Sequence, residues 1–185
     1  MKHDMITLRR LRSDIATLDP LTRATCLIST VIGANGPVYP LSLYVMIGPA
    51  AAPVFITMLA SPLFLAIALL ARSHPRAARA ALPALGTLNT LWCAKLLGGA
   101  SGVELFLLPC ISLATLSFTT RERWLSFALM APPIALYLSH GNAGWLISPL
   151  LHFTPVQLQA LRTLNAASVG MLTAFLGMTY ARLRG

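Results

Sequence analysis

The stretch GGASGVELFLLP, residues 98–109, joins two apolar runs of the chain through a short segment rich in glycine. Its glycines predict a tight turn between two helices, because glycine tolerates backbone conformations that other residues avoid. Ser101 and Glu104 add a hydroxyl and a carboxylate to a neighbourhood that is otherwise apolar. We therefore predict a helical hairpin with polar groups at its tip. The rest of the chain also consists of apolar runs joined by short polar or glycine-containing segments.

Composition indicates that lipid, rather than water, surrounds most of the 185 residues. The chain is 56% hydrophobic and only 10% charged, with a mean hydropathy of +0.72. A soluble domain carries about 25% charged residues. The net charge of +9 does not indicate nucleic acid binding, because the basic residues lie at the ends of apolar runs. The three cysteines lack metal or redox spacing and are interpreted as small buried hydrophobic residues.

The predicted fold class is an all-α, polytopic membrane bundle over residues 20–185. Its six transmembrane helices are expected at about 22–47, 51–72, 79–98, 102–119, 123–139 and 157–181. Because Gly33, Gly36, Pro37 and Pro40 interrupt the first helix, a kink or a break is expected there. Residues 1–19 lack the apolar core of a signal peptide and are predicted to form an amphipathic segment on the cytoplasmic surface.

Basic residues predict the orientation of the bundle. Lys95 and Arg162 are the exceptions among the 14 Lys and Arg residues, and the other twelve lie on one side of the predicted spans. Cytoplasmic loops are rich in Lys and Arg, so both termini are predicted inside. The segment 140–156 on the opposite side is expected to contain an interfacial helix.

Polar side chains near the span ends are candidates for ligand binding, because ionisable groups within a membrane are rarely without function. Lys95 and Glu104 are placed to form an ion pair across the glycine turn, although each could instead extend into the headgroup region. The mid-span amides could serve as structural hydrogen bonds between helices. If the helix faces meet, an outward cleft forms, with seven predicted lining residues: Asn89, Trp92, Lys95, Ser101, Glu104, Arg162 and Asn165.

No metal site is expected, and no cofactor is indicated. His140, His152 and Glu104 would be the candidate ligands, but their spacing matches no compact metal-binding motif.

The tetrapeptide Gly99-Ala100-Ser101-Gly102 has the G-x-S-G form, and with six helices it resembles rhomboid intramembrane proteases. The resemblance implies a serine nucleophile at Ser101 and a histidine base in the sixth helix. Residues 157–181 contain no histidine, and a serine nucleophile needs a base within reach. Ser101 is therefore predicted to be a turn and binding residue, and the chain is not expected to be an enzyme.

A second resemblance covers residues 88–139, where an Asn precedes a Gly-x-x-Ser-Gly turn, a VELFLLP helix, an inner R-E-R and a Pro-containing helix. This pattern is similar to the six-helix membrane module of bacterial sensor histidine kinases and class III adenylate cyclases, although the position of Glu104 is often His there. The resemblance implies a homodimeric receptor in a bacterial inner membrane for an unknown small-molecule or lipid ligand. Its sixth helix would lead through TYARLRG to an effector beyond residue 185.

The alternative is a small substrate-binding subunit of a vitamin transporter, which has the same size and number of helices. For the receptor, close packing between protomers is expected along a small-residue face of the sixth helix. That face comprises Ala167, Gly170, Ala174 and Gly177.

Overall fold

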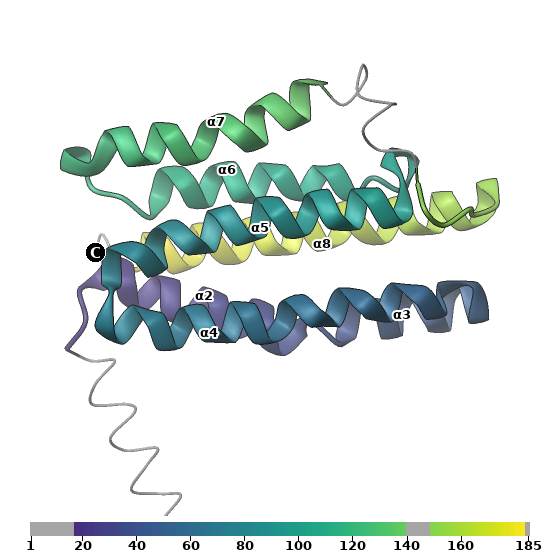
Figure 1. Cartoon of the computed structure of the whole chain (residues 1–185), viewed down its shortest axis with the longest axis horizontal. Helices are drawn as coiled ribbons and strands as arrows, with labels where there is room; N and C mark the ends of the chain where they lie inside the picture. The colour runs from purple at the N-terminus through teal and green to yellow at the C-terminus, as the bar shows by residue number, and fades with distance from the viewer. Residues whose placement is uncertain (1–16, 140–148, 184–185) are drawn as a thin grey trace, which may run out of the picture.

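The computed structural model describes residues 17–139 and 149–183, and over these residues the chain is built of helices and turns without a strand. The helices lie side by side along the long axis of the molecule (Figure 1). The all-α prediction is confirmed. The predictions for residues 1–16 and 140–148 lie outside the described residues.

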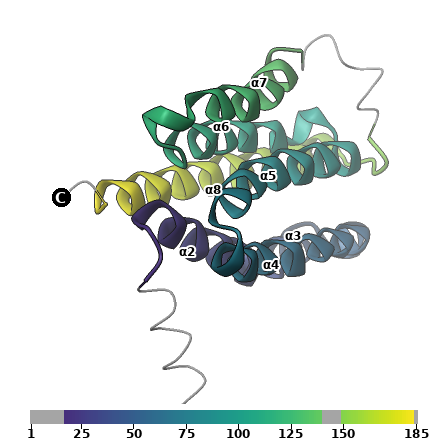
Figure 2. The same cartoon turned by 60° about the vertical axis from the view of Figure 1, so that its left-hand side comes forward.

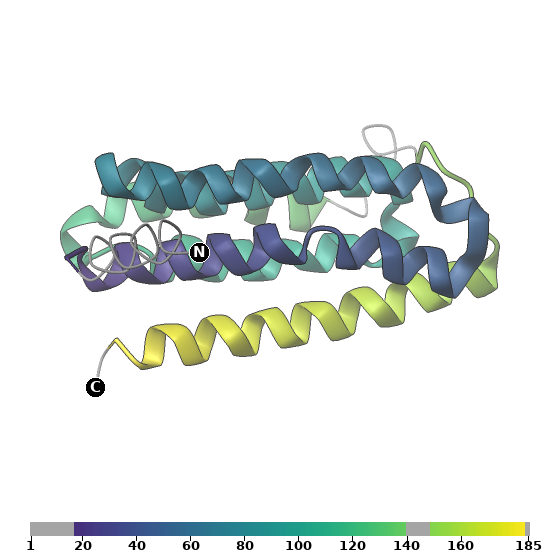
Figure 3. The ribbon, with the colours of Figure 1, turned by 90° about the horizontal axis from the view of Figure 1, so that it is seen from below.

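The first two predicted spans form a helical hairpin. Its outward leg consists of α2 (Pro20–Asn35) and α3 (Val38–Ile47), and its return leg of η1 (Gly48–Leu59) and α4 (Ala60–Ser73). Figure 3 shows the two legs running antiparallel. Asp19 caps the first helix by accepting a hydrogen bond from the Thr22 amide at 3.1 Å. The chain reverses at Gly48, whose φ of 76° favours glycine.

The expected break in the outward leg is confirmed between α2 and α3. Pro37 follows Gly36, and proline cannot donate the backbone hydrogen bond that would continue the helix. The absence of a side chain at Gly36 lets the two legs approach closely, because a Cβ atom there would overlap Oγ of Ser61 on α4.

The return leg begins with an unusually long 3₁₀ helix. η1 has 12 residues and contains Pro53, whereas 3₁₀ runs longer than about four residues are uncommon. Its buried side chains are Ala51, Val54 and Thr57. They recur every third residue, which is the period of a 3₁₀ helix.

The remaining predicted spans also correspond to helical segments. They are α5 (Pro75–Leu97), η3 (Val103–Phe106) with α6 (Leu107–Leu116), α7 (Arg123–Ser139) and α8 (Pro155–Ala181). Two short 3₁₀ turns join them, η2 (Gly99–Ser101) and η4 (Thr120–Glu122).

Local sequence signals explain where α5 and α8 begin. α5 begins four residues before the predicted start, because Pro75 suits the first turn of a helix, where its missing N–H is not needed. Thr154 and Gln157 form a reciprocal capping box at the start of α8.

The helices are arranged in layers. The α2–α4 hairpin forms one layer, α5 and α8 lie against it, and α6 lies on the far side of α5 and α8 (Figure 2). α7 packs on α6 at the outer side and buries only Pro133. We call the end of the bundle where α2, α5 and α7 begin the basic end, and the end that holds Gly48, Gly98 and Gly102 the glycine end.

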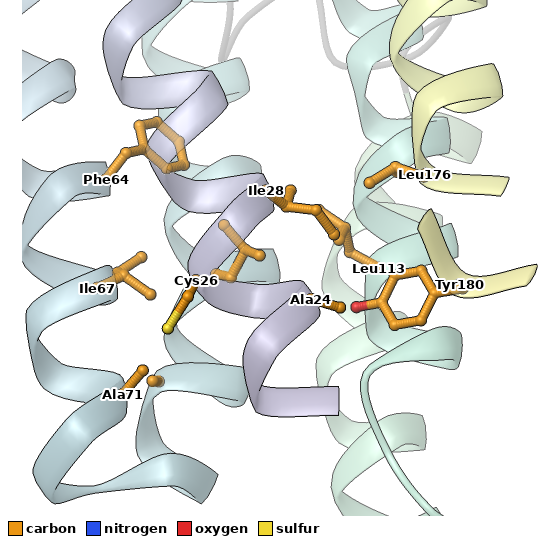
Figure 4. Packing of buried hydrophobic residues seen from close by; sticks show 11 residues of the cluster. Ala24, Cys26, Ile28, Phe64, Ile67, Ala71, Leu113, Leu176 and Tyr180 are labelled. Carbon is orange, nitrogen blue, oxygen red and sulfur yellow. The ribbon is translucent and has the colours of Figure 1, made fainter. Parts of the chain in front are cut away.

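Two hydrophobic clusters fill the bundle, one toward each end. The cluster toward the basic end joins α2, α4, α5, α6 and α8 and includes Ile28, Phe64, Leu113 and Leu176. Figure 4 shows these side chains converging between the helices. The second cluster includes Leu43, Leu97, Val103 and Leu161 and lies beneath the glycine end.

Large apolar side chains also cover the outside of the bundle. Val45 is 78% exposed, Leu69 62%, Leu138 74% and Met171 68%. Large exposed apolar side chains on several helices are typical of a surface that contacts lipid or another protein. Among the described residues, Pro20–Ser73 and Pro155–Ala181 are long and apolar enough to cross a membrane. The pair Val103–Leu116 and Thr120–Ser139, bent by 113°, also qualifies when it is taken together.

The connection before α8 is irregular in its described part, residues 149–154, so the interfacial helix expected over 140–156 does not extend there. Instead, the amides of Leu150 and Leu151 donate to the carbonyls of Lys95 and Leu96 at 2.9 and 3.0 Å. These carbonyls belong to the last turn of α5, where no partner within the helix is available. The connection therefore satisfies the end of α5 instead of forming a helix of its own.

Candidate functional site

The glycine turn at 98–102 is organised by the Ser101 hydroxyl. Gly98 and Gly102 have φ values of 77° and 75°, which favour glycine. The fully buried Ser101 hydroxyl donates to the Gly98 carbonyl and accepts from the Val103 amide at 3.4 Å. The side chain holds the turn closed and has no exposed surface.

The turn is docked onto α8 by a buried amide. Nδ2 of Asn165 donates to the carbonyl of Ser101 at 2.9 Å, and Asn165 is fully buried. Gly102 lies so close to α8 that a Cβ atom there would come within 3.1 Å of Cγ of Arg162. The structure thus brings together three of the seven predicted lining residues.

A tyrosine that sequence analysis did not single out joins this group. The hydroxyl of Tyr39 on α3 approaches Asn165 without the geometry of a hydrogen bond. The hydroxyl and Oδ1 of Asn165 are both buried and form no hydrogen bond with the described residues. The contact between α3, α8 and the turn therefore contains two buried polar atoms that could accept or donate further hydrogen bonds.

The other predicted lining residues lie around the same end of the bundle. Lys95 is in the last turn of α5 and Glu104 in η3, which packs against α5, and both are partly buried. Asn89 is partly buried in the middle of α5. Trp92 is 42% exposed and lies one turn from Leu88, which is 63% exposed. Trp92 therefore faces the surroundings of the bundle.

The metal candidates do not assemble among the described residues. His152 is exposed in the connection before α8. Within residues 17–139 and 149–183, no three His, Cys, Asp or Glu side chains form a group that could hold a metal ion. His140 lies outside the described residues.

The basic end contains a second polar group, centred on the buried guanidinium of Arg79. Its two terminal nitrogens donate to the Glu122 carboxylate at 3.0 and 2.9 Å, a paired geometry that is among the stronger hydrogen-bonded ion pairs. One of them also donates to the Ser117 carbonyl at 3.2 Å, and the guanidinium lies 5.7 Å from the ring centre of Phe118. Arg76 adds an outer contact, with Nε 3.0 Å from Glu122.

Exposure separates the two arginines that share this carboxylate. The side chain of Arg79 is 7% exposed and that of Arg76 is 81% exposed, while that of Glu122 is 13% exposed. Burial alone would raise the pKa of Glu122. Hydrogen bonds from the Thr119 amide and from Arg79, together with the arginine charge, outweigh burial and hold this pKa below its ordinary value.

The same group holds the end of α8. The hydroxyl of Tyr180, in the last turn of α8, is 2.8 Å from Oγ of Ser117 at the end of α6. Tyr180 is only 5% exposed and is directed from α8 toward Ala24 on α2 (Figure 4). A polar network therefore connects α5, α6, η4 and α8 at the basic end.

Sequence analysis missed this network because it treated Arg79 as a charge flanking a span. One signal was available. Residues 20–185 contain two carboxylate side chains, Glu104 and Glu122, and a buried arginine requires a partner. Once Arg79 is placed within a helix near the basic end, Glu122 and the helix-capping Asp19 are the described carboxylates at the same end.

Comparison of the chain with protein-family models, with curated proteins and with solved structures found no match.

Proposed function

We propose that the chain is a multi-pass membrane protein with six spans and with its basic end in the cytoplasm. The apolar exterior supports this, because an aqueous solvent would make so many exposed large side chains unfavourable. The folding back of Pro20–Ser73 also supports it, since each leg of the hairpin exceeds the roughly 20 residues that a span needs. The η3–α6 leg is shorter, and a bilayer accommodates a short span by thinning locally.

The charges at the two ends support the orientation. Arg23, Arg72, Arg76, Arg121 and Arg123 all lie at the basic end, which matches the excess of basic residues in cytoplasmic loops.

Single cysteines at Ala50 and Ser73, on a background without Cys26, Cys93 and Cys110, test this orientation. An impermeant maleimide added to intact cells is expected to label the cysteine at Ala50, near the glycine end, and not the one at Ser73. The reverse pattern would overturn the orientation.

Within this topology we infer a receptor or sensor module whose output helix is α8. The observation that carries the inference is that α8 is held by two buried polar contacts, one to the glycine turn through Asn165 and one at the basic end through Tyr180. Between these contacts most of its residues are exposed. A ligand that binds more tightly to one arrangement of the glycine end would shift the population of α8 positions. The displacement would reach a cytoplasmic effector, such as a kinase or a cyclase, through the end of α8.

The exposed face of α8 supports a homodimer. Gly170 and Gly177 lie on this face, and a Cβ atom at either would meet nothing within 4 Å. Packing within one chain therefore does not require glycine at these positions. Because glycine has no side chain, these positions would let the backbone of a second α8 approach closely.

Cross-linking tests whether the Asn165 contact is coupled to the half of α8 nearer the basic end. Single cysteines at Ala174 and Thr179 on the Cys-free background are expected to form disulfides between protomers in native membranes. Asn165→Ala, which removes the contact at the glycine end, is expected to change the ratio of the two cross-links. Thr163→Ala, an exposed position on the same helix, is the matched control and should leave the ratio unchanged.

An unchanged ratio in the Asn165 variant would refute α8 as the output helix. Absence of both cross-links, with cross-links instead at α2 or α6, would place the dimer contact elsewhere.

A further inference from the structure

The basic end carries a surplus of positive charge where the α4–α5 and α6–α7 junctions meet. Nε of Arg76 lies 3.0 Å from the Glu122 carboxylate, which places Arg76 beside Arg121 and Arg123, the sequence neighbours of Glu122. Both oxygens of Glu122 are already engaged by Arg79. The neighbouring arginines are therefore only partly neutralised.

The surplus can be counted. Arg76, Arg79, Arg121 and Arg123 supply four positive charges, against Glu122 and Asp19, whose charge acts on Arg79 from α2. Four minus two leaves a surplus of two. Arg76, Arg121 and Arg123 are exposed, and the terminal nitrogens of Arg76 make no hydrogen bond within the described residues.

An exposed aromatic pair continues from these arginines along α7. Trp124 is 74% exposed and Phe127 is 54% exposed, and their ring centres are 6.3 Å apart in an edge-to-face arrangement. The guanidinium of Arg123 lies 5.8 Å from the ring centre of Trp124. Arg123 thus links the other arginines to the aromatic pair, and it lies with that pair on α7, which buries only Pro133 among its residues.

We propose that this surface, defined by Arg76, Arg121, Arg123, Trp124 and Phe127, binds an anionic phospholipid. Guanidinium groups bind phosphate oxygens through paired hydrogen bonds, and basic sites between membrane helices on the cytoplasmic side suit anionic headgroups. The aromatic pair lies against the glycerol region and the upper acyl chain, where tryptophan is favoured. A zwitterionic lipid fits less well, because its ammonium group is repelled by the surplus of arginines. The inference rests on the membrane topology proposed above.

Trp124 itself reports on the site. In a chain with Trp92→Phe and Trp145→Phe, Trp124 is the remaining tryptophan, and bromine on an acyl chain quenches its fluorescence on contact. The protein is reconstituted into phosphatidylcholine vesicles containing increasing fractions of either brominated phosphatidylglycerol or brominated phosphatidylcholine. Half-maximal quenching is expected at a several-fold lower fraction of the anionic lipid.

Charge variants test whether the arginines cause this preference. Arg121→Gln and Arg123→Gln are each expected to reduce the preference about fivefold, the factor that one basic residue near an anionic surface contributes. Arg23→Gln is the matched control, because Arg23 is exposed at the same end but lies on α2 in the other layer. It should leave the preference unchanged, and circular dichroism verifies the fold of every variant.

Each other outcome has a distinct meaning. Equal quenching by the two brominated lipids would refute the anionic site and leave the membrane topology standing. Absence of quenching by both would refute the placement of α7 in the membrane, and with it the topology. An equal loss in the Arg23 variant would show diffuse attraction, and displacement by inorganic phosphate beyond that by chloride of equal ionic strength would show a site for free phosphate. Either result would overturn the proposed lipid site.

Discussion

Glu122→Gln is the sharpest test of the polar network at the basic end. The substitution removes a negative charge while retaining nearly the same shape. Glutamine also serves at the third position of a capping box, so the Thr119 cap can persist. What changes is the partner of Arg79, whose two terminal nitrogens would face one amide oxygen and one amide NH₂ group in place of two carboxylate oxygens.

The expected loss follows from the burial of Arg79. Removing one partner from a fully buried ion pair costs about 3–5 kcal/mol, because the remaining charge lacks compensation. The Glu122 side chain is 13% exposed and the Ser117 carbonyl remains an acceptor, so we expect about 2–4 kcal/mol. Arg76→Gln removes the 81% exposed partner of the same carboxylate and is expected to cost at most about 1 kcal/mol.

The assay is equilibrium unfolding in mixed micelles of a mild detergent and sodium dodecyl sulfate, followed by circular dichroism. Adding Arg79→Met to Glu122→Gln removes the uncompensated charge and is expected to recover part of the loss, because apolar replacement of a buried pair is often nearly neutral. If Glu122→Gln and Arg76→Gln lower the free energy of unfolding by the same small amount, and the double variant recovers nothing, the burial of Arg79 does not determine the stability of this ion pair.

Three further measurements address other parts of the bundle. The stability contributed by the Glu122 carboxylate is full above the ordinary pKa of a glutamate and is lost as the pH falls through its lowered pKa. The wild-type protein should therefore lose stability on acidification, and the Glu122→Gln variant should lose less. Gly98→Ala and Gly48→Ala both place alanine at φ near 77°, which costs about 1–3 kcal/mol. At Gly98 the new Cβ would also lie 3.0 Å from a proline side chain, whereas at Gly48 it would meet nothing within 4 Å. Gly98→Ala should therefore lower the melting temperature more than Gly48→Ala. Tyr180→Phe should cost about 1 kcal/mol by removing the hydrogen bond to Ser117, and no change in unfolding would contradict that contact.

The sequence predicted the helical segments well because their determinants are local. Apolar runs, flanking charges and helix-breaking residues are read directly along the chain, and they located the break at Gly36–Pro37 and the turns at Gly48 and Gly98. The glycine turn was predicted to bring neighbouring helix ends together, and the structure places Lys95 and Glu104 at that end. Whether these two residues form an ion pair stays a prediction.

The tertiary contacts were harder to predict because they depend on the rotation of each helix about its own axis. Trp92 is predicted to line the outward cleft, yet it is exposed, since only knowledge of the neighbouring helices fixes which face is buried. Arg79 and Glu122 are separated by 43 residues, and no local pattern connects them. Asn165 was predicted as a mid-span amide that could bond to another helix, but its acceptor, the backbone carbonyl of Ser101, carries no sequence signal.

The long 3₁₀ helix gives the return leg of the hairpin more reach for its residue count. Twelve residues extend about 24 Å at the 3₁₀ rise, against about 18 Å in an α-helix. With three residues per turn, Ala51, Val54 and Thr57 form a straight column against the core. Rewinding to 3.6 residues per turn would rotate Thr57 by about 120° relative to Ala51. Shortening this leg by about 6 Å would therefore require the buried Thr57 side chain to leave the core. The packing of Thr57 thus opposes conversion of η1 to an α-helix.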